Sequence, residues 1–293
     1  MKYLIPILPI LTCCLFSQAE AASFGIARGA TPVLNSPAFG AVFGARDGAT
    51  LKTDRCGQVR ELEFIALPGT PFRLLAEIRG NDSVVYRVET DDYPTPAGGA
   101  LYVASRFIEP METQPPARAR KAPAAADITS ELKAAVGSPY VWGGNIREGI
   151  SDPAGLFHRE TIPAGRRERM ILAGVDCSGL LYQASGGWTP RNTAQLVAFG
   201  NGVPIAGKNA YELVALLEPL DLIVWNGHVI VVLDRETVIE SRLECGKAGN
   251  GGVRTTPLFK RLEEIMRSRR PADAWPAEGK QRGVFVVRRW IVP

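Results

Sequence analysis

Cys177 has the surroundings that best suit nucleophilic chemistry in this chain. From Cys177, apolar residues recur at i+3, i+4 and i+7, which predicts a helix over residues 176–185 with Asp176 as its cap. A cysteine on an apolar helix face is often only a core residue. In the first turn, however, unpaired backbone N–H groups and the positive end of the helix dipole favour a thiolate and can hold an oxyanion. The position therefore indicates a nucleophile that attacks a carbonyl.

Two histidines are candidates for the base that such a nucleophile needs. His158 lies in residues 146–174, a segment interrupted by glycine and proline, where a histidine is typically a solvated surface residue. His228 follows Gly227 and begins an apolar strand, where it is either a core residue or a ring that reaches a helix N-terminus. We favour His228 as the base, with His158 as the alternative.

Glu240, on the strand after His228, is the candidate acceptor that fixes the imidazole tautomer. If residues 233–235 form the loop between the strands, Val232 pairs with Glu236. His228 then lies opposite Glu240, within cross-strand reach. Another register would separate the two side chains and leave Glu240 as an ordinary exposed carboxylate. Spacing alone leaves both interpretations open.

Composition argues against metal and nucleic-acid chemistry. Two histidines and no close pair of cysteines disfavour a zinc site, and we expect neither a metal nor a cofactor. The net charge of +4 is spread over 293 residues, without the aromatic residues among basic runs that nucleic-acid binders need. A nucleic-acid partner is therefore not expected.

The elements that position these residues belong to the second part of the chain, residues 127–293. Asp127 or Thr129 is expected to cap a helix that ends at Val136. We expect strands, the first two joined by an Asn-Gly turn, over residues 221–225, 228–233, 237–240 and 284–291. Helices followed by antiparallel strands predict an α+β domain.

Residues 24–110 show the pattern of a small all-β barrel. Short β-type runs alternate with Gly- and Pro-containing turns, and they cover residues 72–75, 84–88 and 101–103. Residues 111–126 are rich in proline, alanine and basic residues, which is typical of a semi-rigid linker whose charges are solvated.

The first 21 residues have the pattern of a secretory signal peptide: a basic start, an apolar run and small residues before Ala22. The apolar run is too short to span a hydrocarbon core of about 30 Å. We therefore expect an exported protein, periplasmic or extracellular and associated with the cell wall, without an integral membrane segment in the mature chain. Lipidation at Cys13 is the alternative.

Three cysteines remain in the expected mature chain: Cys56, Cys177 and Cys245. In an exported protein an odd count leaves at least one thiol unpaired. Cys56 and Cys245 can pair with each other, which would leave Cys177 free.

Five segments of the second domain occur in a characteristic order: 138–144 (SPYVWGG), 176–180 (DCSGL), 190–196 (PRNTAQL), 221–224 (DLIV) and 227–229 (GHV). They resemble the successive motifs of NlpC-type cell-wall peptidases. The resemblance implies a papain-like fold, with the cysteine helix packed on a small antiparallel sheet. Residues 24–110 are similar to a bacterial Src-homology-3-like domain, in the strand 84–88 and the closing segment 101–107.

The resemblance implies a cysteine endopeptidase that cleaves peptidoglycan stem peptides or muropeptides between D-glutamate and the following diamino acid. It places Cys177 at the nucleophile, His228 at the base and Glu240 at the third, orienting position. Family members more often carry His, Asn or Gln at that third position. A carboxylate there would raise the pKa of the imidazole by favouring its charged form.

Three further residues match family positions that line the site. The hydroxyl of Tyr140 would donate to the oxyanion or the substrate, and Asp176 and Ser178 would contact the amino end of the substrate. A buried aromatic residue and a helix cap are the structural alternatives for Tyr140 and Asp176.

Two features depart from the simplest family pattern. Residues 146–174 form a long insertion that can act as a flap. In some relatives the barrel blocks the cleft, so that only stem peptides with a free L-alanine amine fit, and Glu89, Asp91, Asp92 and Tyr93 are candidate amine-recognising groups. We expect a monomer. An amidase or acyltransferase with the same dyad, or a non-catalytic peptidoglycan-binding protein, are the competing functions.

Overall fold

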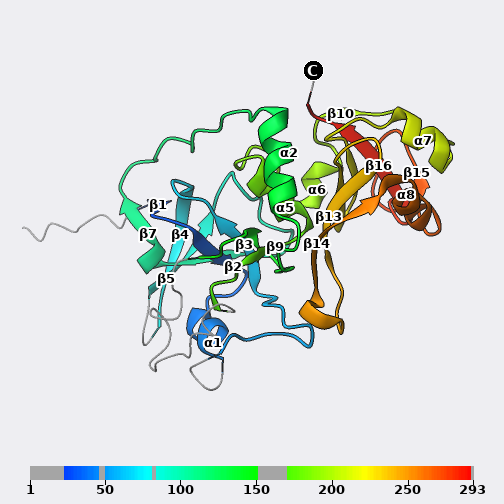
Figure 1. The fold of residues 1–293 in the computed structure, drawn as a ribbon. Coiled ribbons are helices and arrows are strands. Elements are labelled where there is room, and N and C mark those ends of the chain that lie inside the picture. The colour runs from blue at the N-terminus through cyan, green and yellow to red at the C-terminus, as the bar shows by residue number, and fades with distance from the viewer. Residues whose placement is uncertain (1–22, 46–49, 81–83, 151–169, 292–293) are drawn as a thin grey trace, which may run out of the picture.

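The structure is a computed structural model that describes residues 23–45, 50–80, 84–150 and 170–291 (Figure 1). The alternative base His158 and most of the predicted flap lie outside the described residues. Within the described ranges, no helix is long and apolar enough to cross a bilayer.

The first part of the chain forms a seven-stranded antiparallel sheet in the order β3-β2-β6-β5-β4-β1-β7. Its strands are β1 (Phe24–Ala27), β2 (Thr31–Leu34), β3 (Leu62–Ala66), β4 (Pro71–Arg79), β5 (Val84–Glu89), β6 (Leu101–Ala104) and β7 (Ile108–Met111). A short helix α1 (Phe39–Gly44) and a 3-10 turn η1 (Ser105–Phe107) complete it. The predicted β-type runs fall within β4, β5 and β6. The likeness to a Src-homology-3-like barrel, and the domain boundaries, stay predictions.

The second part combines helices with a six-stranded antiparallel sheet in the order β10-β16-β11-β12-β13-β14. Its helices are α2 (Ala125–Ala134), α5 (Cys177–Ala184), α6 (Thr193–Leu196), α7 (Ala210–Leu216) and α8 (Leu258–Met266), with a 3-10 turn η2 (Ala248–Asn250). The sheet consists of β10 (Asn201–Gly202), β11 (Leu222–Trp225), β12 (His228–Val232), β13 (Thr237–Leu243), β14 (Gly251–Pro257) and β16 (Val284–Arg289). Short strands β8 (Asn145–Ile146) and β9 (Gly174–Val175) pair with each other, and β15 (Arg270–Pro271) lies parallel to β16. The expected mixture of helices and antiparallel strands is present.

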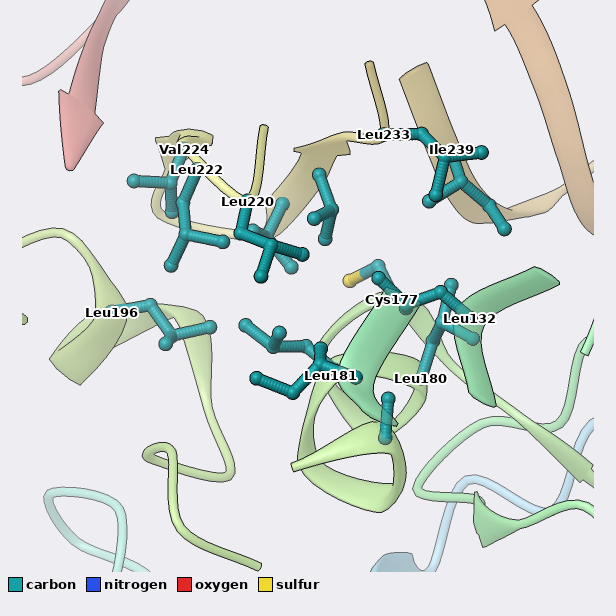
Figure 2. Close-up of a cluster of buried hydrophobic side chains, with 14 of the residues drawn as sticks. Leu132, Cys177, Leu180, Leu181, Leu196, Leu220, Leu222, Val224, Leu233 and Ile239 are labelled. Carbon is teal, nitrogen blue, oxygen red and sulfur yellow. The ribbon is translucent and has the colours of Figure 1, made fainter. Parts of the chain in front are cut away.

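Two hydrophobic clusters sandwich this sheet. Alternate residues of β13 point to opposite faces, so Ile239 joins the cluster with α2 and α5, whereas Val238 joins the cluster with α7 and α8. Figure 2 shows the first cluster, which includes Leu180 and Leu181 of α5 together with Leu222 and Val224 of β11. The helix that carries Cys177 is therefore anchored on the sheet that carries His228 and Glu240.

The start of α2 differs from the prediction. The helix begins at Ala125, and its N-cap, Ala124, makes no side-chain hydrogen bond. Neither Asp127 nor Thr129 is the cap; the Thr129 hydroxyl instead donates to the carbonyl of Ala125 at 2.9 Å. Alanine has the highest helix propensity, so the helix extends back through the alanines before Asp127.

The two parts of the chain share a core. A cluster containing Phe39, Phe43 and Leu62 of the first part also includes Ile150 and Leu172 of the second. The side-chain amide of Asn145 continues the contact: its Nδ2 donates to the carbonyl of Ile65 at 2.8 Å, and its Oδ1 accepts from the Ile65 N–H at 2.9 Å. Cys56 and Cys245 form a disulfide across the same boundary, as the cysteine count allowed.

The linker charges are not all solvated, contrary to the prediction. Residues 111–126 are mostly exposed, but the Arg118 side chain is only 11% exposed and its Nε lies 3.2 Å from Oδ2 of Asp92. Arg120 also pairs with Asp92, and Arg118 donates to the carbonyl of Gly187 at 3.1 Å. A buried carboxylate needs a cation, and these arginines supply it. The linker thereby fastens the first sheet to the end of α5.

Candidate functional site

The N-terminus of α5 presents Cys177 to the sheet. As predicted, Asp176 is the N-cap, and its Oδ1 accepts from the N–H of Gly179 at 2.7 Å. Cys177 is buried, it is the free cysteine among the described residues, and its sulfur lies on the side of the helix that faces the strands (Figure 2). Glycine at 179 permits close packing, since a Cβ there would lie 1.9 Å from the carbonyl oxygen of Gly144.

His228 lies at the first position of β12, after the tight turn Asn226-Gly227 that the sequence predicts. Gly227 has a φ of 103°, which glycine adopts readily. The imidazole Nε2 lies 2.5 Å from Oε2 of Glu240, and Cys177 is close enough to influence the pKa of the ring. Burial alone would lower the pKa of His228, but the hydrogen bonds with Cys177 and Glu240 and the charges of both residues raise it to about 9.

The structure joins His228 and Glu240, although the predicted strand register is wrong. Val232 pairs with Val238, not with Glu236, because the loop includes two more residues. Asp234 stabilises this longer loop, since its Oδ1 accepts from the N–H of Glu236 at 2.9 Å and of Thr237 at 2.7 Å. A shift of two residues keeps every side chain on its face of the sheet, so Glu240 still reaches His228 diagonally.

Glu240 is buried and ionised. Its side chain has no exposed surface, and Arg261 of α8 donates to both of its oxygens, from Nε to Oε1 at 2.7 Å and from Nη2 to Oε2 at 3.0 Å. Burial raises the pKa of this carboxyl, but the hydrogen bonds and charges of His228 and Arg261 outweigh it and lower the pKa to about 2. The alternative of an exposed strand carboxylate is therefore wrong.

Arg261 is not among the predicted site residues, because no helix is predicted over the residues of α8. A signal is present, however: Leu258, Leu262 and Ile265 fall at i, i+4 and i+7, and all three are buried on one face of α8. An arginine beside that apolar stripe points along the helix face toward the sheet.

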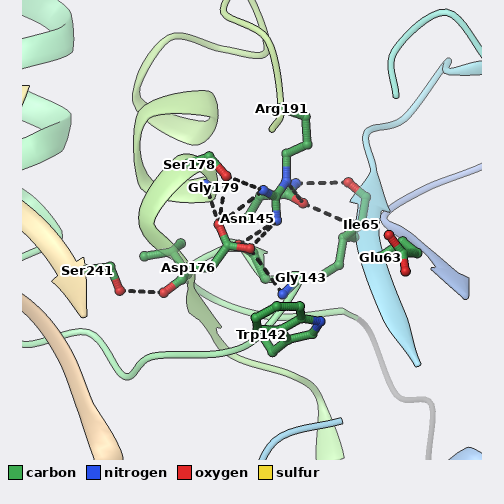
Figure 3. Close-up of polar contacts among 12 residues, drawn as sticks. Glu63, Ile65, Trp142, Gly143, Asn145, Asp176, Ser178, Gly179, Arg191 and Ser241 are labelled. Atoms are coloured by element: carbon green, nitrogen blue, oxygen red, sulfur yellow. Dashed lines mark hydrogen bonds and ion pairs between the residues drawn. The ribbon is translucent and has the colours of Figure 1, made fainter. Parts of the chain in front are cut away.

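Arg191 is the hub of a second polar network at the start of α5, shown in Figure 3. Its guanidinium is fully buried and donates to both oxygens of Asp176, at 3.0 Å and 2.8 Å. It also donates to Ser178 Oγ at 2.9 Å, Asn145 Oδ1 at 3.0 Å and the Gly144 carbonyl at 3.2 Å. Arg191 lies in the PRNTAQL motif, but the sequence alone predicts no role for it.

This network occupies two of the predicted substrate contacts. Besides Arg191 and the N–H of Gly179, Asp176 accepts from Ser178 Oγ at 3.2 Å and from the N–H of Gly143 at 3.1 Å. Asp176 is thus a helix cap and an ion-pair partner. Because the Ser178 hydroxyl is also hydrogen-bonded, a substrate amine would have to share these partners.

Tyr140 lines a cavity of about 790 Å³. Burial, followed by the negative charges of Asp176 and Cys177, raises the pKa of Tyr140 well above its usual range, so its hydroxyl remains a donor at neutral pH. The cavity lies between the two parts of the chain, and Gln58 fixes its wall: its side chain accepts from the N–H of Trp142 at 2.8 Å and donates to the Tyr140 carbonyl at 3.4 Å.

Three of the four candidate amine-recognising residues have intramolecular partners. Glu89 pairs with Arg73, and Asp92 pairs with the linker arginines. The Tyr93 hydroxyl donates to Oε2 of Glu63 at 2.8 Å. Asp91 lines a separate cavity of about 560 Å³ beside β4 and β5. In the part of the chain that the structure describes, no group of three or more His, Cys, Asp or Glu could hold a metal ion.

Comparisons with known proteins give only distant structural matches. No protein-family model matches the sequence, and no sufficiently similar protein is found among the curated ones. Among solved structures, an NlpC/P60 family protein from Bacillus cereus ATCC 10987 is similar at 18% identity and a TM-score of 0.32, covering 92% of this chain and 64% of that one.

Two further structures match in the same way. NlpC2 from Trichomonas vaginalis has 13% identity and a TM-score of 0.32, covering 92% of this chain and 73% of that one. An NlpC/P60 endopeptidase from Photobacterium damselae subsp. piscicida has 13% identity and a TM-score of 0.39, covering 80% and 66%. The chain thus spans less than two thirds of the length of the Bacillus protein. At such low identity and TM-score, a functional assignment has to rest on the residues of the site.

Proposed function

We propose that this chain is an exported cysteine endopeptidase of the NlpC type that cleaves peptidoglycan stem peptides at the γ-D-glutamyl–diamino acid bond. One observation carries the proposal: His228 interacts with Cys177 at the start of α5, which helps to raise its pKa, and its Nε2 lies 2.5 Å from the buried carboxylate of Glu240. A nucleophile, a base and an orienting acceptor in this order are what amide cleavage by a thiolate requires.

The geometry supports a two-step reaction. His228 takes the proton of Cys177, and the resulting thiolate attacks the amide carbonyl. The oxyanion accepts hydrogen bonds, which we assign to the backbone N–H of Cys177 and the hydroxyl of Tyr140. The imidazolium then donates its proton to the departing amine, which leaves a thioester on Cys177. In the second step His228 takes a proton from water, hydroxide attacks the thioester, and the thiol is restored.

Glu240 supports both steps through His228. Its ionised carboxylate accepts from Nε2, which sets the tautomer and stabilises the imidazolium that forms when Cys177 is a thiolate. The raised pKa of His228 favours the protonated imidazole at neutral pH. For the amino end of the substrate, Asp176 and Ser178 stay the candidate contacts, added to the hydrogen bonds that they already make.

One sequence pattern and one disulfide support export. The pattern of residues 1–21 predicts a signal peptide, and lipidation at Cys13 is the alternative. The Cys56–Cys245 disulfide is of a kind that persists in oxidising compartments outside the cytoplasm. We expect the protein to act there as a monomer.

A muropeptide digest tests the proposal. The chain from Ala22 is incubated with L-Ala-γ-D-Glu-diamino acid peptides, and the products are identified by mass spectrometry. We expect L-Ala-D-Glu and a peptide that begins with the diamino acid, and no products from Cys177→Ala. No cleavage by the unsubstituted protein, or equal cleavage by Cys177→Ala, would contradict the assignment. Hydrolysis adds the mass of water, whereas an acyltransferase conserves the acyl group on an acceptor. An amidase would release the whole stem peptide from the glycan.

A further inference from the structure

Apart from His228, Arg261 is the residue that makes the closest contacts to Glu240. It comes from α8, 21 residues further along the chain, and it is 9% exposed. Its Nε and Nη2 engage the two carboxylate oxygens as a fork, while Nη1 donates to Oε2 of Glu264 on the same helix at 3.2 Å. A guanidinium held at three nitrogens fixes the plane of the carboxylate that it grips.

We propose that Arg261 is a positioning residue of the active site: it fixes both oxygens of Glu240 so that Oε2 faces Nε2 of His228. The functional unit is then a line of four residues, Cys177, His228, Glu240 and Arg261. This inference rests on the proposed function, because it assigns Arg261 a part in that reaction. It also explains how Glu240 can be buried at this position. A carboxylate needs a counter-charge there, whereas a neutral acceptor would not.

The surrounding charges leave Arg261 as the principal partner of Glu240. From its own strand, Arg242 approaches Oε1 only to 3.7 Å, and its side chain is 31% exposed. His228 engages Oε2 alone, and its own neighbours are Cys177 and the ring of Trp225, over which Arg269 stacks. Without Arg261 the carboxylate can rotate about its side chain, and burial then favours its protonated form. Both changes weaken the acceptor that stabilises the imidazolium.

The test measures two properties, one of which needs no substrate. The rate at which iodoacetamide alkylates Cys177 is followed against pH, with peptide mapping to locate the label, and the inflection at higher pH reports deprotonation of His228. We expect this inflection near pH 9 in the unsubstituted protein and nearer to 6.5 in Arg261→Met and in Glu240→Gln. With muropeptides, Arg261→Met should lower kcat about ten- to a hundredfold with KM unchanged, by analogy with the loss that follows removal of a partner that orients a metal-binding histidine. Arg261→Lys keeps the positive charge but not the two parallel hydrogen bonds. Its inflection pH and its kcat should therefore lie between those of the unsubstituted protein and those of Arg261→Met.

The double variant separates positioning from folding. If Arg261 acts through Glu240, adding Arg261→Met to Glu240→Gln should change neither the inflection nor kcat further. The double variant removes both members of the buried pair, so it also serves if Arg261→Met alone fails to fold. A double variant much slower than Glu240→Gln would overturn the proposal, as would a folded Arg261→Met whose inflection stays near pH 9 or rises.

Arg289→Met is the matched control. Arg289 grips the buried carboxylate of Asp221 with the same fork, at 2.9 Å and 2.7 Å, at the opposite end of β11 from Trp225. Its loss should destabilise the fold without moving the alkylation inflection. Since alkylation requires no peptide, a protein that cleaves no muropeptide but shows the expected inflections contradicts the proposed substrate and retains the role of Arg261.

Discussion

The Cys56–Cys245 disulfide is expected to contribute several kcal/mol to the stability of the fold. It joins residues that are 189 positions apart. In the chain-entropy model, closing a loop of that length removes about 18 cal/mol/K from the unfolded chain, or about 5 kcal/mol at 25 °C. We therefore expect Cys56→Ser/Cys245→Ser to lower the free energy of unfolding by about 3–5 kcal/mol.

The same bond lies next to a turn that lines the cavity beside Tyr140. Asp54 Oδ1 accepts from the N–H of Cys56 at 2.8 Å and of Gln58 at 2.9 Å, which makes the turn 54–58 a unit. Gln58 in turn holds the backbone on either side of Val141, through the Tyr140 carbonyl and the Trp142 N–H. Loss of the disulfide should therefore raise KM for muropeptides more than it lowers kcat, because the catalytic line lies on other elements.

Urea unfolding followed by tryptophan fluorescence measures the stability effect, with Cys177→Ser as the matched cysteine control. The unsubstituted protein, reduced under mild conditions, should behave like the double serine variant. A decrease in the free energy of unfolding of less than about 1 kcal/mol would refute the predicted effect of the disulfide. It would mean that contacts of the shared core around Phe39 and Ile150 already constrain the loop in the unfolded ensemble. Equal KM values for the unsubstituted protein and for Cys56→Ser/Cys245→Ser would refute the proposed role of the turn.

Two further predictions concern charges in the site. Arg191→Met should destabilise the fold by about 3–5 kcal/mol, because it leaves Asp176 without its buried cation; Arg147→Met, which removes an exposed ion pair with Glu148, should cost less than about 1 kcal/mol in the same urea titration. The pKa of His228 is about 9 in the folded protein and 6.5 in an unfolded chain, so its proton binds more tightly to the folded state. Its stabilisation, on the order of 3 kcal/mol, should be complete below pH 6.5 and lost as the pH rises through about 9. His228→Asn should remove this pH dependence, and a slope that is unchanged in His228→Asn would contradict the assignment.

Local patterns predicted the elements that carry the site. The cap at Asp176, the turn at Gly227 and the strands on either side of that turn depend on residues close in sequence, and the structure confirms them. The strand register was wrong by two residues, since an Asx turn at Asp234 lengthened the loop. The error left Glu240 within reach because β-strand side chains alternate with a period of two; an error of one residue would have excluded it.

Long-range partners escaped prediction for a physical reason. Arg261 meets Glu240 only after α8 packs on the sheet, and Asn145 meets Ile65 across 80 residues of chain. Such contacts follow from tertiary packing, which local hydrophobic periodicity does not predict. Charge pairing offers a partial guide, because a carboxylate predicted on a buried strand requires a cation from somewhere else in the chain.

That requirement links the stability of the site to its chemistry. An uncharged residue at the position of Glu240 would need only one hydrogen bond, to His228. A buried carboxylate with His228 as its only partner would lose its counter-charge each time the imidazole gives up its proton. Arg261 supplies a permanent counter-charge, so Glu240 stays ionised when His228 is neutral as well as when it is protonated. The carboxylate and the arginine therefore act as a pair, and replacing either one alone should destabilise the fold more than replacing both.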